Sequence, residues 1–215
     1  MSGVDLARAG DVVGDLIAAI NANRAWLSEI DGAIGDGDHG VNMSKGFTQA
    51  GEAIAAEASP PGLARAFAML GDTLLSGIGG SMGPLYGTFF LDMGGALEDR
   101  TELDAALFGQ MLHAGLSGVQ DLGGAKRGDK TLLDTLIPAL EAYDAALGEG
   151  AAFAAALDAM AAAAAQGRDA TRDMAAKIGR AARLGERSRG TIDAGAASCC
   201  LILQSMAASL TRHLA

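Results

Sequence analysis

The sequence has almost no cysteine, no excess of basic over acidic residues and no long hydrophobic run, and each shortage excludes a class of protein. Its two cysteines, Cys199 and Cys200, are adjacent, which suits neither a loop-closing disulfide nor the spaced ligand pairs of a zinc site. We therefore expect reduced, buried thiols and a cytoplasmic protein. The formal net charge of −10 disfavours binding to nucleic acid or to an anionic membrane surface.

The N-terminal segment does not have the pattern of a signal peptide, because Asp5 and Asp11 stand where basic and then apolar residues are needed. The sequence has no run of about 18 apolar residues, so we expect no segment to span a membrane. A single hydrophobic core can serve a chain of up to ~250 residues. Residues 1–215 are therefore expected to form one domain.

Aromatic residues are also scarce, at 4%, whereas half of the residues are apolar and many of these are alanine. Alanine-rich runs favour helices and let them approach closely, and apolar residues recur at three- and four-residue spacing with no strand-like alternation. These patterns predict an all-α fold. The expected helices are residues 3–28, 41–57, 62–77, 84–98, 102–121, 130–147, 151–181 with a break near Gly167, and 194–213. Thr101 and Asp104 suggest a capping box, and Asp129 suggests a second cap.

Four glycine-rich connections between these helices carry polar residues that a simple turn does not require. Loops between antiparallel helices alternate between the two ends of a bundle, so we expect several of these connections to meet at one rim. The four segments are IGDGDHG, GIGGSMGP, GGAKRGD and LGERSRGTIDAG.

The first connection brings Asp31, Asp36 and Asp38 within eight residues, and its glycines let the backbone turn so that all three can face one point. Carboxylates this close repel one another unless a cation lies among them, which indicates Mg²⁺ or Ca²⁺. The EF-hand pattern fails because Val41 stands where glycine is required, so Mg²⁺ shared with phosphate oxygens is preferred. The alternative is a helix-breaking loop in which Asp38 caps the next helix.

The second connection places several glycines before Pro84, which suits the first position of a helix. Its free amide N–H groups form an anion-binding feature, although similar turns are common without any ligand.

The third connection resembles a Walker loop, but Asp129 adds one residue before Lys130 and Thr131. The preceding segment is also predicted to be helical, so we exclude a P-loop fold. Lys126, Arg127 and Lys130 then form a basic turn that lies either near phosphate or in solvent, with Arg127 expected in solvent.

The segment from Lys177 to Arg189, which runs into the fourth connection, has five basic residues and one acid within an otherwise acidic chain. Arginine suits phosphate oxygens, although one or two of these residues are expected to pair with acids. A carboxylate cluster, free amides and arginine together suit a nucleotide phosphate tail. His39 is either a hydrogen-bonding positioner or a catalyst, and no residue is assigned as catalytic; His113 and His213 receive no role.

Four segments, in this order, resemble motifs of the nucleotide-binding L subunit of phosphotransferase-dependent dihydroxyacetone kinases: IGDGDHGVNMSKGF, GGSMGPLYGTFF, GDKTLLDTLIPA and LGERSRGTIDAGAAS. The resemblance implies a barrel of about eight antiparallel amphipathic helices with ADP or ATP at one rim. It also implies two Mg²⁺ ions held by Asp31, Asp36 and Asp38. The nucleotide contacts that it implies are His39, Gly40, Val41, Asn42, Ser81, Met82, Gly123, Leu132, Arg180, Asp193, Ala194 and Gly195.

Two positions depart from the family pattern. Ser81-Met82 replaces a small residue followed by serine, so a hydroxyl contact to phosphate is either lost or supplied from the neighbouring position. Ala194 replaces the proline of an Asp-Pro-Gly turn, which loosens the turn but keeps its carboxylate.

The resemblance implies a division of labour among subunits. A separate K subunit would hold dihydroxyacetone or a related ketose, and a phosphodonor subunit of the phosphotransferase system would rephosphorylate ADP. A homodimer is left open. The alternatives are a nucleotide-sensing protein that regulates a transcription factor, a kinase subunit that exchanges ATP and acts on another small sugar, and an alanine-rich bundle without a ligand.

Overall fold

The computed structural model describes residues 3–214, so residues 1, 2 and 215 of the expected domain lie outside the described part. The described chain is built from helices, which confirms the all-α prediction. The α-helices are α1 (Asp11–Ala22), α2 (Arg24–Ile34), α3 (His39–Ala55), α4 (Leu63–Gly77), α5 (Met82–Gly95), α6 (Ala105–Gly123), α7 (Leu133–Gly148), α8 (Phe153–Ala170) and α9 (Ala194–Leu214). Two 3-10 helices, η1 (Thr171–Asp173) and η2 (Arg180–Ser188), and two short strands, β1 (Val4–Asp5) and β2 (Glu102–Leu103), complete the described elements.

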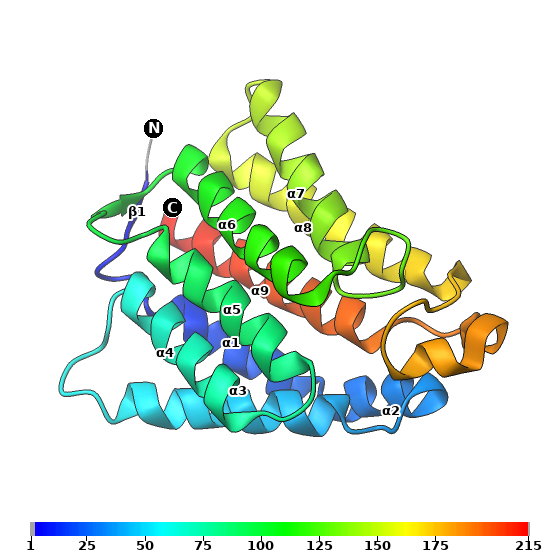
Figure 1. The fold of residues 1–215 in the computed structure, drawn as a ribbon. Helices are drawn as coiled ribbons and strands as arrows, with labels where there is room; N and C mark the ends of the chain where they lie inside the picture. Colours follow the sequence, from blue (N-terminus) through cyan, green and yellow to red (C-terminus); the bar gives the residue numbers. More distant parts are fainter. Residues whose placement is uncertain (1–2, 215) are drawn as a thin grey trace.

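The helices pack on one another in a cyclic order, and α9 closes the cycle (Figure 1). In this order α1 contacts α3, each helix from α3 to α8 contacts the next one along the chain, and α9 contacts both α8 and α1. Helix α2 lies outside the cycle, against α3 and α9. Strands β1 and β2 pair at one end of the molecule, opposite α2 and η2 (Figure 1). Each helix of the cycle therefore has a packed neighbour on both sides.

One apolar cluster extends through the described chain from Val4 to Leu210. Small residues let its helices approach closely: a Cβ on Gly167 of α8 would lie 2.3 Å from the carbonyl oxygen of Asp134 in α7. Cys199 and Cys200 are free thiols inside this cluster, as expected. Helix α9 is long and apolar enough to cross a membrane by length and composition, but 67% of its most apolar window is buried in the molecule. It is therefore a core helix of this fold.

Two of the expected helices differ from the structure by more than three residues. The segment 3–28 is not one helix: residues 4–5 form β1 and α1 begins only at Asp11. It is also interrupted at Asn23, whose side-chain amide donates a 2.8 Å hydrogen bond to the carbonyl of Ala19 and competes with the helical pattern. The segment 151–181 has no break near Gly167, and its helix ends at Ala170 instead of continuing to residue 181. There, the Thr171 hydroxyl donates to the carbonyl of Arg168 and accepts from the amide of Asp193. Both endings involve polar contacts that apolar spacing does not reveal.

Both expected caps also differ from prediction. Residues 102–103 pair with β1, so Asp104 rather than Thr101 caps α6, and its Oδ1 accepts from the amide of Leu107 at 2.8 Å. Asp129 is not a cap, because α7 begins only at Leu133 and the Asp129 carboxylate accepts from the amide of Lys126. A tertiary strand pair and a tight turn therefore override the local signals.

Candidate functional site

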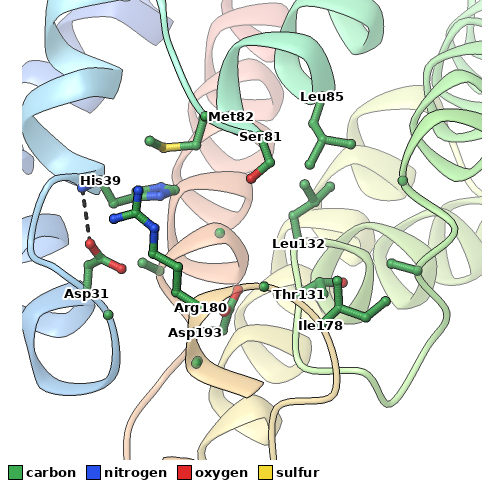
Figure 2. Close-up of a pocket in the computed structure, with 18 of the residues that line it drawn as sticks. Asp31, His39, Ser81, Met82, Leu85, Thr131, Leu132, Ile178, Arg180 and Asp193 are labelled. Atoms are coloured by element: carbon green, nitrogen blue, oxygen red, sulfur yellow. Dashed lines mark hydrogen bonds between the residues drawn. The ribbon is translucent and has the colours of Figure 1, made fainter. Parts of the chain in front are cut away.

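The four glycine-rich connections meet at one end of the helical domain and surround a cavity of about 730 Å³ (Figure 2). They join α2 to α3, α4 to α5, α6 to α7, and η2 to α9. The chain therefore concentrates its polar loop residues at one site, although these residues are far apart in sequence.

An acidic cluster forms one side of this cavity. Asp31 lies in the last turn of α2, Asp36 in the connection and Asp38 directly before α3, and their carboxylate oxygens can lie within 4.8 Å of one another. A side chain at position 35 is excluded, since a Cβ there would lie 2.4 Å from Oδ1 of Asp31; Gly37 turns the chain with φ of 77°. Asp38 occupies the N-cap position but makes no side-chain capping bond, so its carboxylate remains available. Three converging oxygen donors fit a hard divalent cation.

Arg180 reaches this cluster from η2. Its guanidinium pairs with the carboxylate of Asp36, and Figure 2 shows its side chain extending towards Asp31 and His39. Among the other basic residues of this segment, Lys177 pairs with Asp129. A cationic side chain thus lies directly beside the three carboxylates, and its guanidinium can also bind other anionic oxygens there.

His39 belongs to a buried hydrogen-bonded chain below the cluster. Its Nε2 lies 2.9 Å from Oγ of Ser198, which lies 2.7 Å from the hydroxyl of Tyr86. Burial lowers the pKa of His39 to about 4, although the negative charge of Asp31 opposes this shift. The imidazole is therefore neutral near pH 7, and the geometry favours the positioning role over that of a general base.

Asp193 sits at the start of α9, where its Oδ2 accepts from the amide of Ala196 at 2.8 Å. Burial raises the pKa of Asp193 to about 7, against the opposing effects of that hydrogen bond and of the Lys130 charge. A 3.0 Å bond from the Asp193 amide to Oγ1 of Thr171 also holds the turn. These bonds fix the turn although Ala194 replaces proline.

The opposite side of the cavity is apolar, with Leu85, Val119, Leu122, Leu132 and Ile178 in its lining. Figure 2 shows Leu85, Leu132 and Ile178 across the cavity from Asp31 and His39. Apart from Leu132, sequence reasoning missed this wall, because apolar residues near helix ends look like ordinary core residues. Such a surface suits a flat heterocyclic base beside its charged phosphates.

All but two of the residues expected at the site line the cavity. Ser81 is exposed before α5 and points into the cavity in Figure 2, so the hydroxyl is available one position away from its place in the family pattern. The two residues outside the lining are Gly40 and Val41. Val41 is 42% exposed, whereas Gly40 is buried against α2.

The structure also corrects the interpretation of the basic turn. Arg127 is exposed, as expected, and pairs with Glu141. Lys130 is not in solvent, and it is not free to bind phosphate: it is 1% exposed and donates to three backbone carbonyls. Sequence could not show this, because all three acceptors lie more than 40 residues away.

We predict that Gly40→Ala lowers the free energy of unfolding by about 1–3 kcal/mol, because the added Cβ would overpack a close helix contact. That Cβ would lie 2.0 Å from the carbonyl oxygen of Arg24 and 2.8 Å from the amide nitrogen of Ser28. Urea unfolding without nucleotide measures the change. Gly14→Ala is the control, because a Cβ at this position in α1 meets nothing within 4 Å and alanine favours a helix. Equal stability of the Gly40→Ala variant and the native chain would show that the α2–α3 contact is not tight.

The fold and the cavity define a helical domain with an oxygen-rich cation site beside an apolar pocket, and comparison with known proteins gives its family. The profile of the DAK2 domain matches residues 33–208, and the chain belongs to this family.

Two relatives are similar over nearly their whole length. The chain is 37% identical over 187 residues to the ADP-binding subunit DhaL of PEP-dependent dihydroxyacetone kinase 1 of Listeria innocua, covering 87% of this chain and 88% of that protein. It is 36% identical to the corresponding Escherichia coli K12 subunit, covering 94% and 92%. The structure resembles the dihydroxyacetone kinase of C. freundii in complex with AMP-PNP and Mg²⁺, with a TM-score of 0.70 and 26% identity. The match covers 94% of this chain but 33% of that kinase.

Proposed function

We propose that residues 1–215 form a single domain that acts as the nucleotide-carrying subunit of a PEP-dependent dihydroxyacetone kinase. In this role it holds ADP or ATP with Mg²⁺ and presents the terminal phosphoryl group to dihydroxyacetone, or a related small ketose, on a separate K subunit. The observation that carries the proposal is the cluster of Asp31, Asp36 and Asp38 at the charged end of a half-apolar cavity. The names of the two DhaL relatives support the substrate and the nucleotide.

The donor set fits magnesium, since all three side chains supply hard oxygen ligands from a short, glycine-shaped loop. Two Mg²⁺ ions shared by these carboxylates would neutralise and orient the nucleotide phosphates. The complex of the C. freundii kinase with AMP-PNP and Mg²⁺ supports this pairing of ligands.

The remaining residues of the site act by position and charge. The apolar wall receives the base and excludes water, and the backbone amides at the starts of α5 and α9 face the phosphates. Arg180 balances charge on the transferred group, while His39 stays neutral and holds the floor of the site through Ser198. The chain thus contributes alignment and electrostatic stabilisation, and proton transfer from the ketose belongs to the K subunit.

The proposed assembly follows from the same relatives. Their names describe a PEP-dependent enzyme, so a phosphodonor subunit of the phosphotransferase system would restore ATP from the bound ADP. The chain covers about nine-tenths of these separate subunits and has the length of one such component. We place the assembly in the cytoplasm, where the buried thiols Cys199 and Cys200 would stay reduced.

Reconstitution tests this proposal. The purified chain is mixed with its K and phosphodonor subunits, PEP and dihydroxyacetone, and formation of dihydroxyacetone phosphate is followed. We expect turnover only when all three proteins are present. Nucleotide binding without ketose consumption would contradict the kinase role and favour the nucleotide-sensing alternative. Mass spectrometry of the purified chain separates retained ADP, which we expect, from a readily exchanged nucleotide.

A further inference from the structure

Lys130 has an unusual environment for a lysine. It is 1% exposed, and its backbone lies in the left-handed region with φ of 63°, which costs a residue other than glycine of order 1 kcal/mol. Its Nζ donates to the carbonyls of Met174 at 3.2 Å, Ser188 at 2.5 Å and Thr191 at 2.7 Å. None of the ion pairs found among residues 3–214 includes Lys130.

The three acceptors define the protonation state and exclude one role. A neutral amine has two N–H donors, whereas three carbonyls require the three donors of an ammonium group. Burial lowers the pKa of Lys130, and the negative charge of Asp193 counteracts this. With all three N–H groups bound to carbonyls, Lys130 has none left for a phosphate oxygen. The Lys130 ammonium group therefore binds the protein backbone and not a ligand.

These carbonyls belong to the two ends of one segment, residues 174–191, which contains η2. Met174 lies at its start, and Ser188 and Thr191 lie at its end. The ends are also linked directly, because the Ala176 amide donates to Oγ of Ser188 at 2.8 Å. None of residues 177–187, all in the described part of the chain, is buried. The segment is therefore anchored at its base. Beyond the base it is held by fewer contacts: the Lys177 amide donates to the carbonyl of Asp129, and η2 lies against α2.

Arg180 lies within this part of the segment. Its guanidinium faces the acidic cluster and pairs with Asp36. Both partners are exposed, at 59% for the Arg180 side chain and 45% for the Asp36 side chain. Exposed pairs of this kind hold a segment only weakly. The position of Arg180 relative to the cavity thus depends in part on how firmly the ends of the segment are joined.

We propose that Lys130 is a positioning residue that fixes Arg180 over the charged end of the cavity by binding both ends of the 174–191 segment. This inference rests on the proposed phosphoryl-transfer function. It also explains why a residue other than glycine adopts the left-handed conformation here: the turn directs the Lys130 side chain inward, between the two ends of the segment.

Lys130→Met tests the proposal, because methionine keeps most of the side-chain length while removing all three donors. In the reconstituted kinase we expect kcat to fall at least about tenfold, with the Kd for Mg·ADP within about threefold of the native value. In an Arg180→Met background the same substitution should lower kcat by less than about twofold, since both changes remove one function. Losses that multiply in the double variant would overturn the proposal, because Lys130 would then act independently of Arg180.

Hydrogen exchange provides a readout that does not depend on activity. In Lys130→Met, the amides of Ala176 and Lys177 should exchange at least about tenfold faster, while amides of the core helix α9 keep their native rates. Unchanged exchange at these amides would overturn the anchoring role even if the wild-type chain proved to bind no nucleotide. If the wild-type chain is inactive but Lys130→Met shows the expected faster exchange, only the proposed function is refuted.

Two further variants complete the test. Lys126→Met removes an exposed charge from the same turn and should leave kcat and exchange unchanged. Ser188→Ala removes the direct link between the segment ends and should reproduce the Lys130→Met effects more weakly. If Lys130→Met does not fold, Ser188→Ala decides: a fall in kcat that disappears in the Arg180→Met background supports the proposal, and a fall that persists there contradicts it.

Discussion

Asp36→Asn is expected to weaken Mg·ADP binding by at least about 100-fold and to abolish measurable phosphoryl transfer, because the change removes one charged oxygen ligand from a three-carboxylate site. The far-ultraviolet circular dichroism should not change, because Asp36 lies in a connection and is exposed. Calorimetric titration with ADP in excess Mg²⁺ measures the affinity, and the reconstituted assay measures transfer.

Asp72→Asn is the matched control for this result. It makes the same change of charge at an exposed position in α4, away from the cavity lining, and should bind Mg·ADP like the native chain. Near-native affinity and turnover in Asp36→Asn would exclude Asp36 as a metal ligand. Equal losses in both variants would instead point to the overall charge of the chain.

Arg180→Met is expected to lower kcat by about 100- to 1000-fold while changing the Kd for Mg·ADP by less than about tenfold, as for an arginine that stabilises charge on a transferring phosphoryl group. Folding stability should change by less than about 1 kcal/mol, because the Arg180–Asp36 pair is exposed. Single-turnover kinetics with the K subunit separates the transfer step from nucleotide binding.

The control for Arg180 comes from the same helix. Arg187 lies in η2, is exposed and does not line the cavity, so Arg187→Met should retain native kcat. A similar loss of kcat in both variants would mean that η2 acts through its total charge, for example in subunit docking. Native kcat in Arg180→Met would remove this arginine from the transfer step.

Much of this architecture could be predicted from sequence because its signals are local. Apolar spacing and alanine-rich runs define most of the helices, and the three aspartates lie so close in sequence that a short loop must bring them together. The convergence of the four connections follows from the alternation of loops in an antiparallel helical fold. These features require no knowledge of contacts between distant segments.

The features that escaped prediction depend on such contacts. Lys130 binds carbonyls that are 44 to 61 residues away, and Gly40 is buried because α3 packs closely on α2. Helix α8 ends where Thr171 bonds to Asp193, 22 residues further along the chain. The apolar wall forms only when α5, α6 and α7 lie side by side. Residue spacing cannot reveal interactions of this kind.

The most direct test of a metal-dependent nucleotide site is calorimetric titration of the purified native chain, stripped of nucleotide, with ADP in the presence and absence of Mg²⁺. We expect saturable 1:1 binding with Mg²⁺ and binding at least about 100-fold weaker with EDTA, because the acidic cluster repels phosphate without a cation. Equal affinity in the two titrations, or no binding heat in either, would contradict a metal-dependent nucleotide site at Asp31, Asp36 and Asp38.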